Sequence, residues 1–550
     1  MMFPRRILQA PVWTAAVIAI CGIAICGIAS CRPAVNTEPP GAGGSGGAST
    51  SGNGGMSSAG GTAAGGGGSS VGGAGGGTGG TGGTGGSGGT KATGGAGGSG
   101  GAGGGTGGTG GAGGTGGSGG TGGSGGTGGS GGTGGGAGGA STTPDAAPPL
   151  PSRGPANPTT GHNFPFPQNR ENTRCIYPKL YRNEDVQAIY TKWKNDTVTS
   201  DGAKGFRRVK RPNEPGLEPN STVSEGIGYG MLLAVYMDDQ SLFDDLWKYE
   251  QANLDSGSYL MNWYIKADGS GIGSDPSGSG PASDADEDMA LALVMADKQW
   301  GGKGSSTRTY IDWAKETIGK IWSKEVISGK YLSPWPATGL PAINLSYFAP
   351  AYYKIFAKVD TANASGWKTL TDTMYDVLAK SLNSSSGNAT NGLVPAWCDG
   401  NGVPNGGAFG ATGGASPTNY QYDSCRTPFR IGLDYCWTGE TRAKDYVAKT
   451  SSFFNDTVGG ATKIVDGYAL NGTPQAQYQK DAKAQIQSAA FVGPAGVGAM
   501  SSPTYQTFVN DAYGVLIKGD AIVGGTYYDE SWMVMSLLMM TANFIDYTSL

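Results

Sequence analysis

The sequence predicts an all-α fold, a ring of six helical hairpins, for the part of the chain that follows a long glycine-rich region. About twelve stretches between residues 183 and 544 space their apolar side chains at the helical period of 3.6 residues. No run of alternating apolar and polar residues, which would indicate strands, lies between them. Because so many helices in one compact region can pair into hairpins, we expect a closed ring with its functional loops at one end.

The first five helices each follow an N-cap candidate. These candidates are Asn183, Ser224, Ser241, Ser283 and Thr307, and apolar residues recur at helical spacing after each of them. Loops rich in glycine, proline and asparagine separate the helices. Seven further helices are expected over residues 347–358, 367–382, 427–437, 441–454, 489–500, 505–516 and 531–544.

Composition restricts the functional class. The chain has 550 residues and a formal net charge of −4, and it carries no Lys/Arg patch of the kind that binds nucleic acid. Its one histidine, His162, excludes most Ser-His-Asp and Cys-His mechanisms and any metal site built from several histidines. A hydrolase built from this chain must therefore work with carboxylates.

Residues 1–31 have the pattern of a secretory signal. Arg5 and Arg6 precede an apolar run that reaches Ile28, and small residues follow. The ending Ile-Ala-Ser-Cys resembles the lipobox of bacterial lipoproteins, in which the cysteine, here Cys31, is acylated. We therefore expect a membrane anchor at Cys31 and a location at the bacterial outer membrane or cell surface. An ordinary signal peptide, which would give a secreted protein, and an uncleaved anchor helix are the alternatives.

A glycine-rich region follows the expected signal. More than half of the 104 glycines lie between residues 41 and 140, among many Ser, Thr and Ala residues. These residue types bury too little side chain to offset the entropy that is lost on ordering. We predict a disordered linker over residues 32–155 and one catalytic domain over residues 156–550, with a monomer as the default state.

Four cysteines lie in the expected domain, namely Cys175, Cys398, Cys425 and Cys436. An even number in an exported domain permits two disulfides, with three pairings open, and four free buried thiols are the alternative. No pair has the Cys-x-x-Cys spacing that would indicate zinc.

Three acidic positions each stand at the start of an expected helix, beside aromatic or glycine-rich segments. Glu225 lies in a Ser-Glu-Gly-Ile-Gly-Tyr-Gly motif, Asp284 opens an acidic cluster over residues 284–288, and Asp423 precedes Arg426 by one helical turn. The guanidinium of Arg426 could hold the Asp423 carboxylate ionised. The alternatives are carboxylates that interact only with helix dipoles, and for the cluster a calcium loop, whose spacing is not that of an EF-hand.

Residues 282–300 resemble the signature of glycoside hydrolase family 8. The motif at 224–230 resembles that family's general-acid motif, and Tyr-Asp-x-x-Arg at 422–426 resembles its general-base motif. The segments at 260–263 and 346–350 follow in the expected order. The chain from about residue 175 onward is thus identified as a member of this family, most similar to its bacterial endoglucanases.

The resemblance implies an (α/α)6 barrel and an inverting mechanism on β-1,4-linked glycans, with no cofactor and no metal. It implies that Glu225 is the general acid, that Asp423 is the general base, and that Asp284 positions and distorts the sugar at the cleavage point. Tyr347 and Arg426 would support the water and the base. A general acid must stay protonated, so Glu225 needs a raised pKa, which a nearby ionised Asp284 would promote and its helix dipole would oppose.

Aromatic rings are the expected sugar-binding surfaces, because pyranose faces present C–H groups that pack on rings. Trp263 and Trp335 are the first candidates, and Tyr528 and Trp397 follow. Pro334 stands where the family's endoglucanases commonly carry an arginine. We expect a secreted, lipid-anchored endo-β-1,4-glucanase acting on cellulose or mixed-linkage glucan. An endo-xylanase, a chitosanase and a non-catalytic glycan-binding surface protein are the alternatives.

Overall fold

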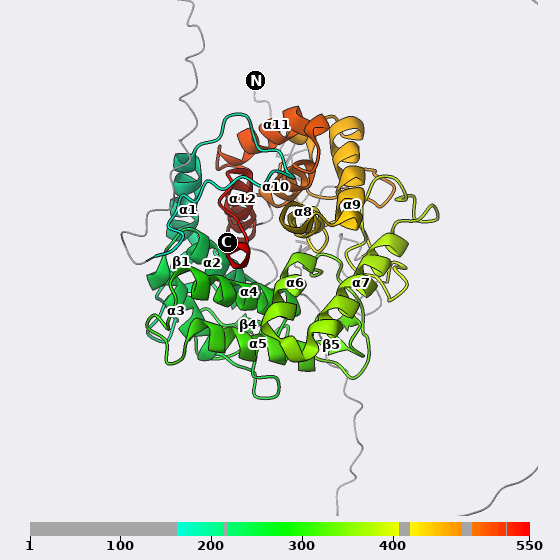
Figure 1. Ribbon diagram of the computed structural model, residues 1–550. Helices are drawn as coiled ribbons and strands as arrows, with labels where there is room; N and C mark the ends of the chain where they lie inside the picture. The colour runs from blue at the N-terminus through cyan, green and yellow to red at the C-terminus, as the bar shows by residue number, and fades with distance from the viewer. Residues whose placement is uncertain (1–161, 214–216, 406–417, 476–486, 524) are drawn as a thin grey trace, which may run out of the picture. The chain divides into compact units, whose positions relative to one another are not determined.

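The computed structural model describes residues 162–213, 217–405, 418–475, 487–523 and 525–550 (Figure 1). The expected signal peptide at 1–31, with Cys31, and the expected linker at 32–155 lie outside the described residues. Over the described ranges, no helix combines the length and apolar character that a membrane span requires.

Twelve α-helices lie in the described ranges, and each matches a helix expected from the sequence. They are α1 (Asn183–Thr197), α2 (Ser224–Tyr236), α3 (Gln240–Gln251), α4 (Ser283–Gln299), α5 (Tyr310–Lys324), α6 (Pro350–Val359), α7 (Ala364–Ser381), α8 (Thr427–Thr438), α9 (Thr441–Ser452), α10 (Ala489–Ala499), α11 (Gln506–Leu516) and α12 (Thr526–Met540).

The even-numbered helices form an inner ring, and the odd-numbered helices surround it (Figure 1). Each inner helix packs against the next, from α2 to α4 and so on to α12, and α12 packs against α2 to close the ring. The outer helices α3, α5, α7, α9 and α11 each pack on the inner helix before them, and α1 packs on α12. The fold is therefore an (α/α)6 barrel, as predicted.

The inner helices carry mostly apolar or small side chains, because most of their surface is buried. Every residue of α2 and of α10 is buried. Glycines let these helices approach closely: a Cβ on Gly228 would lie 3.0 Å from the backbone oxygen of Ala285 in α4. A Cβ on Gly432 of α8 would lie 3.2 Å from the Cα of Gly498 in α10. Larger side chains at these positions would push the ring apart.

Several helices begin away from the expected caps. Asn183, Ser224 and Ser283 are themselves the first residues of α1, α2 and α4, and no side-chain hydrogen bond caps these helices. Asp239 and Thr309 cap α3 and α5 instead of the serine and threonine two residues away, and their side-chain oxygens accept backbone N–H groups of the first turn. The apolar period therefore predicts the helices, but not their first residues.

Two later helices also begin elsewhere than expected. Pro350 is the first residue of α6, a position where its missing N–H leaves no hydrogen bond unmade, so Tyr347 lies in the preceding loop. The helix expected from residue 531 begins at Thr526, which places Tyr527 and Tyr528 in the first turn of α12.

Three antiparallel pairs of two-residue strands lie in the loops, and such short pairs carry no alternation that the sequence could reveal. They are β1 (Val198–Thr199) with β2 (Arg208–Val209), β3 (Thr222–Val223) with β4 (Tyr264–Ile265), and β5 (Val326–Ile327) with β6 (Tyr331–Leu332). The β3–β4 pair leads into α2, where the N–H of Ser224 donates to the carbonyl of Trp263 at 2.8 Å.

Among the four cysteines that the structure describes, one disulfide joins Cys175 to Cys436, and Cys398 and Cys425 are free and buried. Neither the two disulfides that the sequence permits nor the alternative of four free thiols is present. The bond ties the segment before α1 to the C-terminal end of α8, across a sequence separation of 261 residues.

Replacing both Cys175 and Cys436 with serine should lower the free energy of unfolding by about 2–5 kcal/mol, because the unfolded chain loses a long covalent loop. Guanidinium denaturation measures this loss. A reductant should lower the wild-type midpoint and leave that of the double variant unchanged. Equal midpoints for the two proteins would show that the bond does not stabilise the domain.

Candidate active site

Arg426 lies between the first turns of two inner helices. It is fully buried, and its Nη1 donates to Oε2 of Glu225 and to Oδ2 of Asp284, both at 2.7 Å. The same nitrogen donates to the Tyr229 hydroxyl at 3.0 Å. One guanidinium thus joins the two carboxylates that the sequence singled out at the starts of α2 and α4.

The placement of these side chains follows from the ring. Glu225 and Asp284 are the second residues of α2 and α4, and Arg426 is the N-cap of α8. Since the three residues touch, these inner helices begin at the same end of the barrel. The unpaired N–H groups at helix starts make this end favourable for negative charge.

Two residues of the loop before α6 also contact the Arg426 guanidinium. Nε of Arg426 donates to Oγ of Ser346 at 2.9 Å, and its guanidinium carbon lies 4.9 Å from the ring centre of Tyr347. The ring face attracts the cation, and the hydroxyl fixes its orientation. Tyr347 therefore joins the cluster, as expected from the sequence.

Both carboxyl oxygens of Glu225 are hydrogen-bonded. Oε2 accepts from Arg426, and Oε1 accepts from the Tyr527 hydroxyl at 2.7 Å. Burial raises the pKa of Glu225 to about 8; the Arg426 charge acts in the opposite direction, and the Asp284 charge adds to the rise. The raised pKa that a general acid requires is thus present, and burial is its first cause.

Asp423 is buried near the same end, in the loop before α8. Its Oδ2 accepts from Nε1 of Trp397 and from Nε2 of Gln421, both at 3.1 Å. Its Oδ1 has no hydrogen-bond partner among the described residues. Burial raises the pKa of Asp423 to about 6, and the Arg426 charge opposes this rise. The carboxyl is therefore mostly ionised at neutral pH, with one oxygen available.

The charge of Arg426 lowers the pKa of Asp423, as expected from the sequence. No hydrogen bond joins them within the described part of the chain, and Arg426 acts on Asp423 only through its charge. The buried carboxylates of Glu225 and Asp284 accept the hydrogen bonds of Nη1, so Arg426 favours the ionised form of Asp423 without bonding to it.

Most carboxylates of the acidic cluster at 284–288 are hydrogen-bonded to different partners. Glu287 accepts from the Tyr353 hydroxyl at 2.6 Å, and Asp288 forms a two-pronged ion pair with Arg430. Among the described residues, no group of three or more His, Cys, Asp or Glu side chains could hold a metal ion. Within the described part of the chain, the remaining member, Asp286, forms no hydrogen bond to a cationic side chain.

Asp286 faces Glu325, the C-cap of α5, and both are fully buried. Their four carboxyl oxygens accept no N–H or O–H donor among the described residues. Burial raises the pKa of both groups well above the usual range, and their mutual repulsion adds to the rise for Glu325. A proton shared between the two oxygens is the arrangement that avoids an unpaired buried charge.

A row of aromatic rings borders Asp423. Trp335 is half-buried, its ring centre lies 6.5 Å from that of Trp397, and Trp397 lies 6.0 Å from Tyr347. Because Trp397 also donates to Asp423, this row connects a partly exposed ring to the buried carboxyl. Of the aromatic residues predicted to bind sugar, Trp335 is therefore the one that is not buried.

Trp263 and Tyr528 are placed differently. Trp263 is fully buried beside the start of α2, and its Nε1 donates to the carbonyl of Ser277 at 2.9 Å. Tyr528 is 6% exposed and donates to the carbonyl of Tyr422 at 2.9 Å, which holds the loop residue before Asp423. Their sugar-binding roles stay predictions, and their observed contacts support the backbone on both sides of the cluster.

Sequence reasoning missed several residues of the cluster. Tyr229 stands four residues after Glu225 on the same helix face, so its position in the motif was a usable signal. Tyr527 carried no such signal, because it is 302 residues away from the carboxyl that it contacts. Ser346 lies within a segment that the resemblance marked and Gln421 lies next to one, but only the folded chain shows what they bind.

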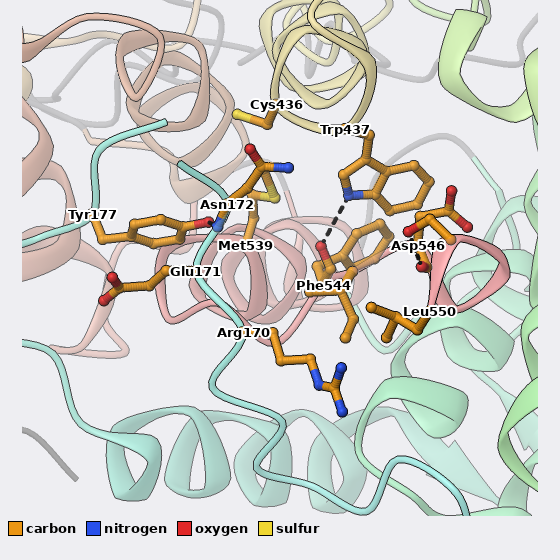
Figure 2. A pocket seen from close by; sticks show the side chains of 12 residues that line it. Arg170, Glu171, Asn172, Tyr177, Cys436, Trp437, Met539, Phe544, Asp546 and Leu550 are labelled. Atoms are coloured by element: carbon orange, nitrogen blue, oxygen red, sulfur yellow. Dashed lines mark hydrogen bonds between the residues drawn. The ribbon is translucent and has the colours of Figure 1, made fainter. Parts of the chain in front are cut away.

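The pocket in Figure 2 lies elsewhere. It is about 140 Å³ in volume and is lined by residues of the segments at 170–177 and 544–550 and by Cys436 and Trp437. Since ten residues of helix separate Arg426 from Cys436, it lies about 15 Å along α8 from the carboxylate cluster. The pocket is therefore separate from the candidate active site.

Comparisons with known proteins agree on one family. The model of glycosyl hydrolases family 8 matches residues 164–542. Endoglucanase 2 of Ruminiclostridium josui is 37% identical over 388 residues, which cover 69% of this chain and 77% of that protein. A beta-glucanase of Niallia circulans is 31% identical over 407 residues, which cover 70% of this chain and 92% of that protein.

A solved structure is similar over the same part of the chain. The apo structure of a beta-1,3-1,4-glucanase from Paenibacillus sp. X4 superposes with a TM-score of 0.60 and 29% sequence identity, covering 69% of this chain and 98% of that one. The region matched by the family model contains Glu225, Asp284 and Asp423.

The Asp286–Glu325 pair predicts a dependence of stability on pH. Because both pKa values are raised in the folded protein, the folded pair keeps a proton that the unfolded chain releases above about pH 4. The stability that the pair contributes is therefore complete at low pH and is lost as the pH rises toward the folded pKa values. The double variant Asp286→Asn/Glu325→Gln stays neutral at both positions, so between pH 5 and 8 its free energy of unfolding should fall less than that of the wild type.

Denaturation curves at several pH values measure this difference. Asp268→Asn, which changes a fully exposed carboxylate, is the control and should follow the wild type. A parallel fall for the double variant and the wild type would exclude the shared proton.

Proposed function

The chain belongs to glycosyl hydrolases family 8, and we propose that it cleaves β-1,4-glucan with inversion, with Glu225 as general acid and Asp423 as general base. It is a glycoside hydrolase with endo-glucanase activity. The observation that carries this conclusion is the similarity to endoglucanases, of which Endoglucanase 2 is 37% identical over 388 residues. The family match over residues 164–542 holds all three acidic positions.

The pKa of Glu225 supports its role as the acid. At neutral pH a carboxyl with a pKa of about 8 is mostly protonated and can give its proton to the glycosidic oxygen as the C–O bond breaks. The carboxylate that remains is stabilised by the N–H of Arg426 and the O–H of Tyr527, which are already in place.

The hydrogen bonds of Asp423 support its role as the base. Trp397 and Gln421 hold Oδ2, so Oδ1 is the oxygen that can accept a proton from an attacking water. With a pKa of about 6, the carboxylate is ionised at neutral pH and still basic enough to take that proton. The hydroxide oxygen then bonds to the anomeric carbon on the face opposite the leaving group.

Asp284 is proposed to hold the sugar at the cleavage point. Its Oδ2 is bound by Arg426, and the Asp284 charge contributes to the raised pKa of Glu225. Arg426 therefore neutralises part of the charge on Asp284 without bonding to the base. The partly exposed Trp335 is the proposed platform for a neighbouring glucose unit.

Reducing-sugar release tests the proposal. The wild-type protein should cleave carboxymethylcellulose or barley β-glucan, and Glu225→Gln and Asp423→Asn should each lose at least about 100-fold in turnover because proton transfer is lost. Glu250→Gln is the matched control: Glu250 is also buried and also has a pKa of about 8, but it lies in α3, outside the cluster.

The substrate panel also includes xylan and chitosan. If the protein cleaved only xylan or only chitosan, the proposed roles of the two carboxyls would stand, and the proposed substrate would be wrong. Near-wild-type turnover by Glu225→Gln would refute the assignment of the acid, and the absence of all cleavage by a folded protein would favour a glycan-binding role.

We also propose that the enzyme is exported and anchored by a lipid on Cys31. The support is the sequence pattern of residues 1–31 alone. The wild-type chain, expressed in a bacterium, should sediment with the membranes, whereas Cys31→Ala should not. Ser30→Ala keeps a small residue before the cysteine and is the control. Equal membrane fractions for all three proteins, or an N-terminal peptide of unmodified mass, would exclude the lipid anchor.

A further inference from the structure

Tyr527 reaches the proposed acid from the helix that closes the ring. It is the second residue of α12, it is buried, and its hydroxyl donates to Oε1 of Glu225 at 2.7 Å. α12 packs against α2, so this hydrogen bond spans the junction where the barrel closes. Contacts fix the position of the Tyr527 ring in addition to that of its hydroxyl.

Two neighbours hold the ring in place. A Cβ on Gly226, the residue after the acid, would lie 3.4 Å from the Tyr527 ring, so the ring packs directly against the backbone of α2. The guanidinium carbon of the buried Arg211 lies 5.6 Å from the ring centre. Burial raises the pKa of the Tyr527 hydroxyl well above its ordinary value, so it remains a proton donor over the working pH range.

We propose that Tyr527 is a positioning residue that stabilises the ionised form of the general acid and so assists protonation of the leaving group. The inference rests on the proposed role of Glu225. In this step, the proton moves from Glu225 to the glycosidic oxygen, and the bond from that oxygen to the anomeric carbon breaks. The attacking water gives a proton to Asp423, and its oxygen bonds to the anomeric carbon. The carboxylate formed at Glu225 accepts the Tyr527 O–H more strongly than the neutral carboxyl did.

The position of the two donors explains why both are needed. Arg426 binds Oε2 but shares its Nη1 with Asp284 and Tyr229, whereas Tyr527 provides the hydrogen bond to Oε1. A charged donor at the start of α8 and an uncharged donor in α12 thus hold the two oxygens. The Tyr527 hydrogen bond also keeps the pKa of Glu225 lower than burial alone would set it.

The pH profile of Tyr527→Phe tests the proposal. In the wild type, kcat/KM should decrease below about pH 6, where Asp423 is protonated, and above about pH 8, where Glu225 has lost its proton. In Tyr527→Phe the alkaline limb should shift to higher pH, because the ionised acid has lost a donor, while the acidic limb stays in place. At neutral pH, kcat should fall roughly 10- to 100-fold, as expected for a lost hydrogen bond to a charged group.

Tyr236→Phe is the matched control. Tyr236 is a buried tyrosine at the C-terminal end of α2, and its hydroxyl donates to the carbonyl of Ile545, so its loss should move neither limb. A dinitrophenyl β-cellooligosaccharide, whose leaving group needs little protonation, should restore most of the rate to Tyr527→Phe. This rescue separates the proposed role from a general loss of folding.

Each outcome decides a different point. An unchanged alkaline limb in Tyr527→Phe, or an equal loss on the dinitrophenyl substrate, would overturn the role of Tyr527. If Glu225→Gln were active on glucan, the assignment of the acid itself would fail, whatever the profile of Tyr527→Phe.

Discussion

The buried charge of Arg426 is the interaction on which the catalytic end of this barrel depends. Glu225 and Asp284 are withdrawn from water at the starts of two inner helices, and Arg426 donates to both. A buried ion cluster of this kind is held by its geometry, since removal of one partner leaves the others as unpaired buried charges. The ring fixes that geometry because all three residues stand at helix starts.

The Arg426 charge acts on both Glu225 and Asp423, yet the two carboxyls have different pKa values. The Arg426 charge opposes the effect of burial at both Glu225 and Asp423, yet Glu225 stays near 8 and Asp423 near 6. The Asp284 charge raises the pKa of both carboxyls, whereas two neutral donors, Trp397 and Gln421, lower that of Asp423 and one, Tyr527, lowers that of Glu225. Environment rather than residue type therefore separates the acid from the base.

The helices and the three acidic positions could be predicted from the sequence because their signals are local. Apolar spacing indicates each helix, and motifs mark Glu225, Asp284 and Asp423. Contacts between distant segments could not be predicted. Tyr527 contacts Glu225 only because α12 packs against α2 and closes the ring. Arg426 bonds to carboxylates of α2 and α4 and not to its sequence neighbour Asp423. The local sequence pattern thus predicts the candidate catalytic residues, and the closed ring of helices determines which side chains contact them.

The Cys175–Cys436 bond has a mechanical consequence. A pull on the chain from before residue 162 reaches this covalent link before it reaches α1. The load then passes into the C-terminal end of α8 and runs along the helix toward Arg426 at its other end. A domain that holds a polymer at its catalytic end while its N-terminal side is held elsewhere would thus carry tension along one inner helix, and the outer helix α1 would be spared.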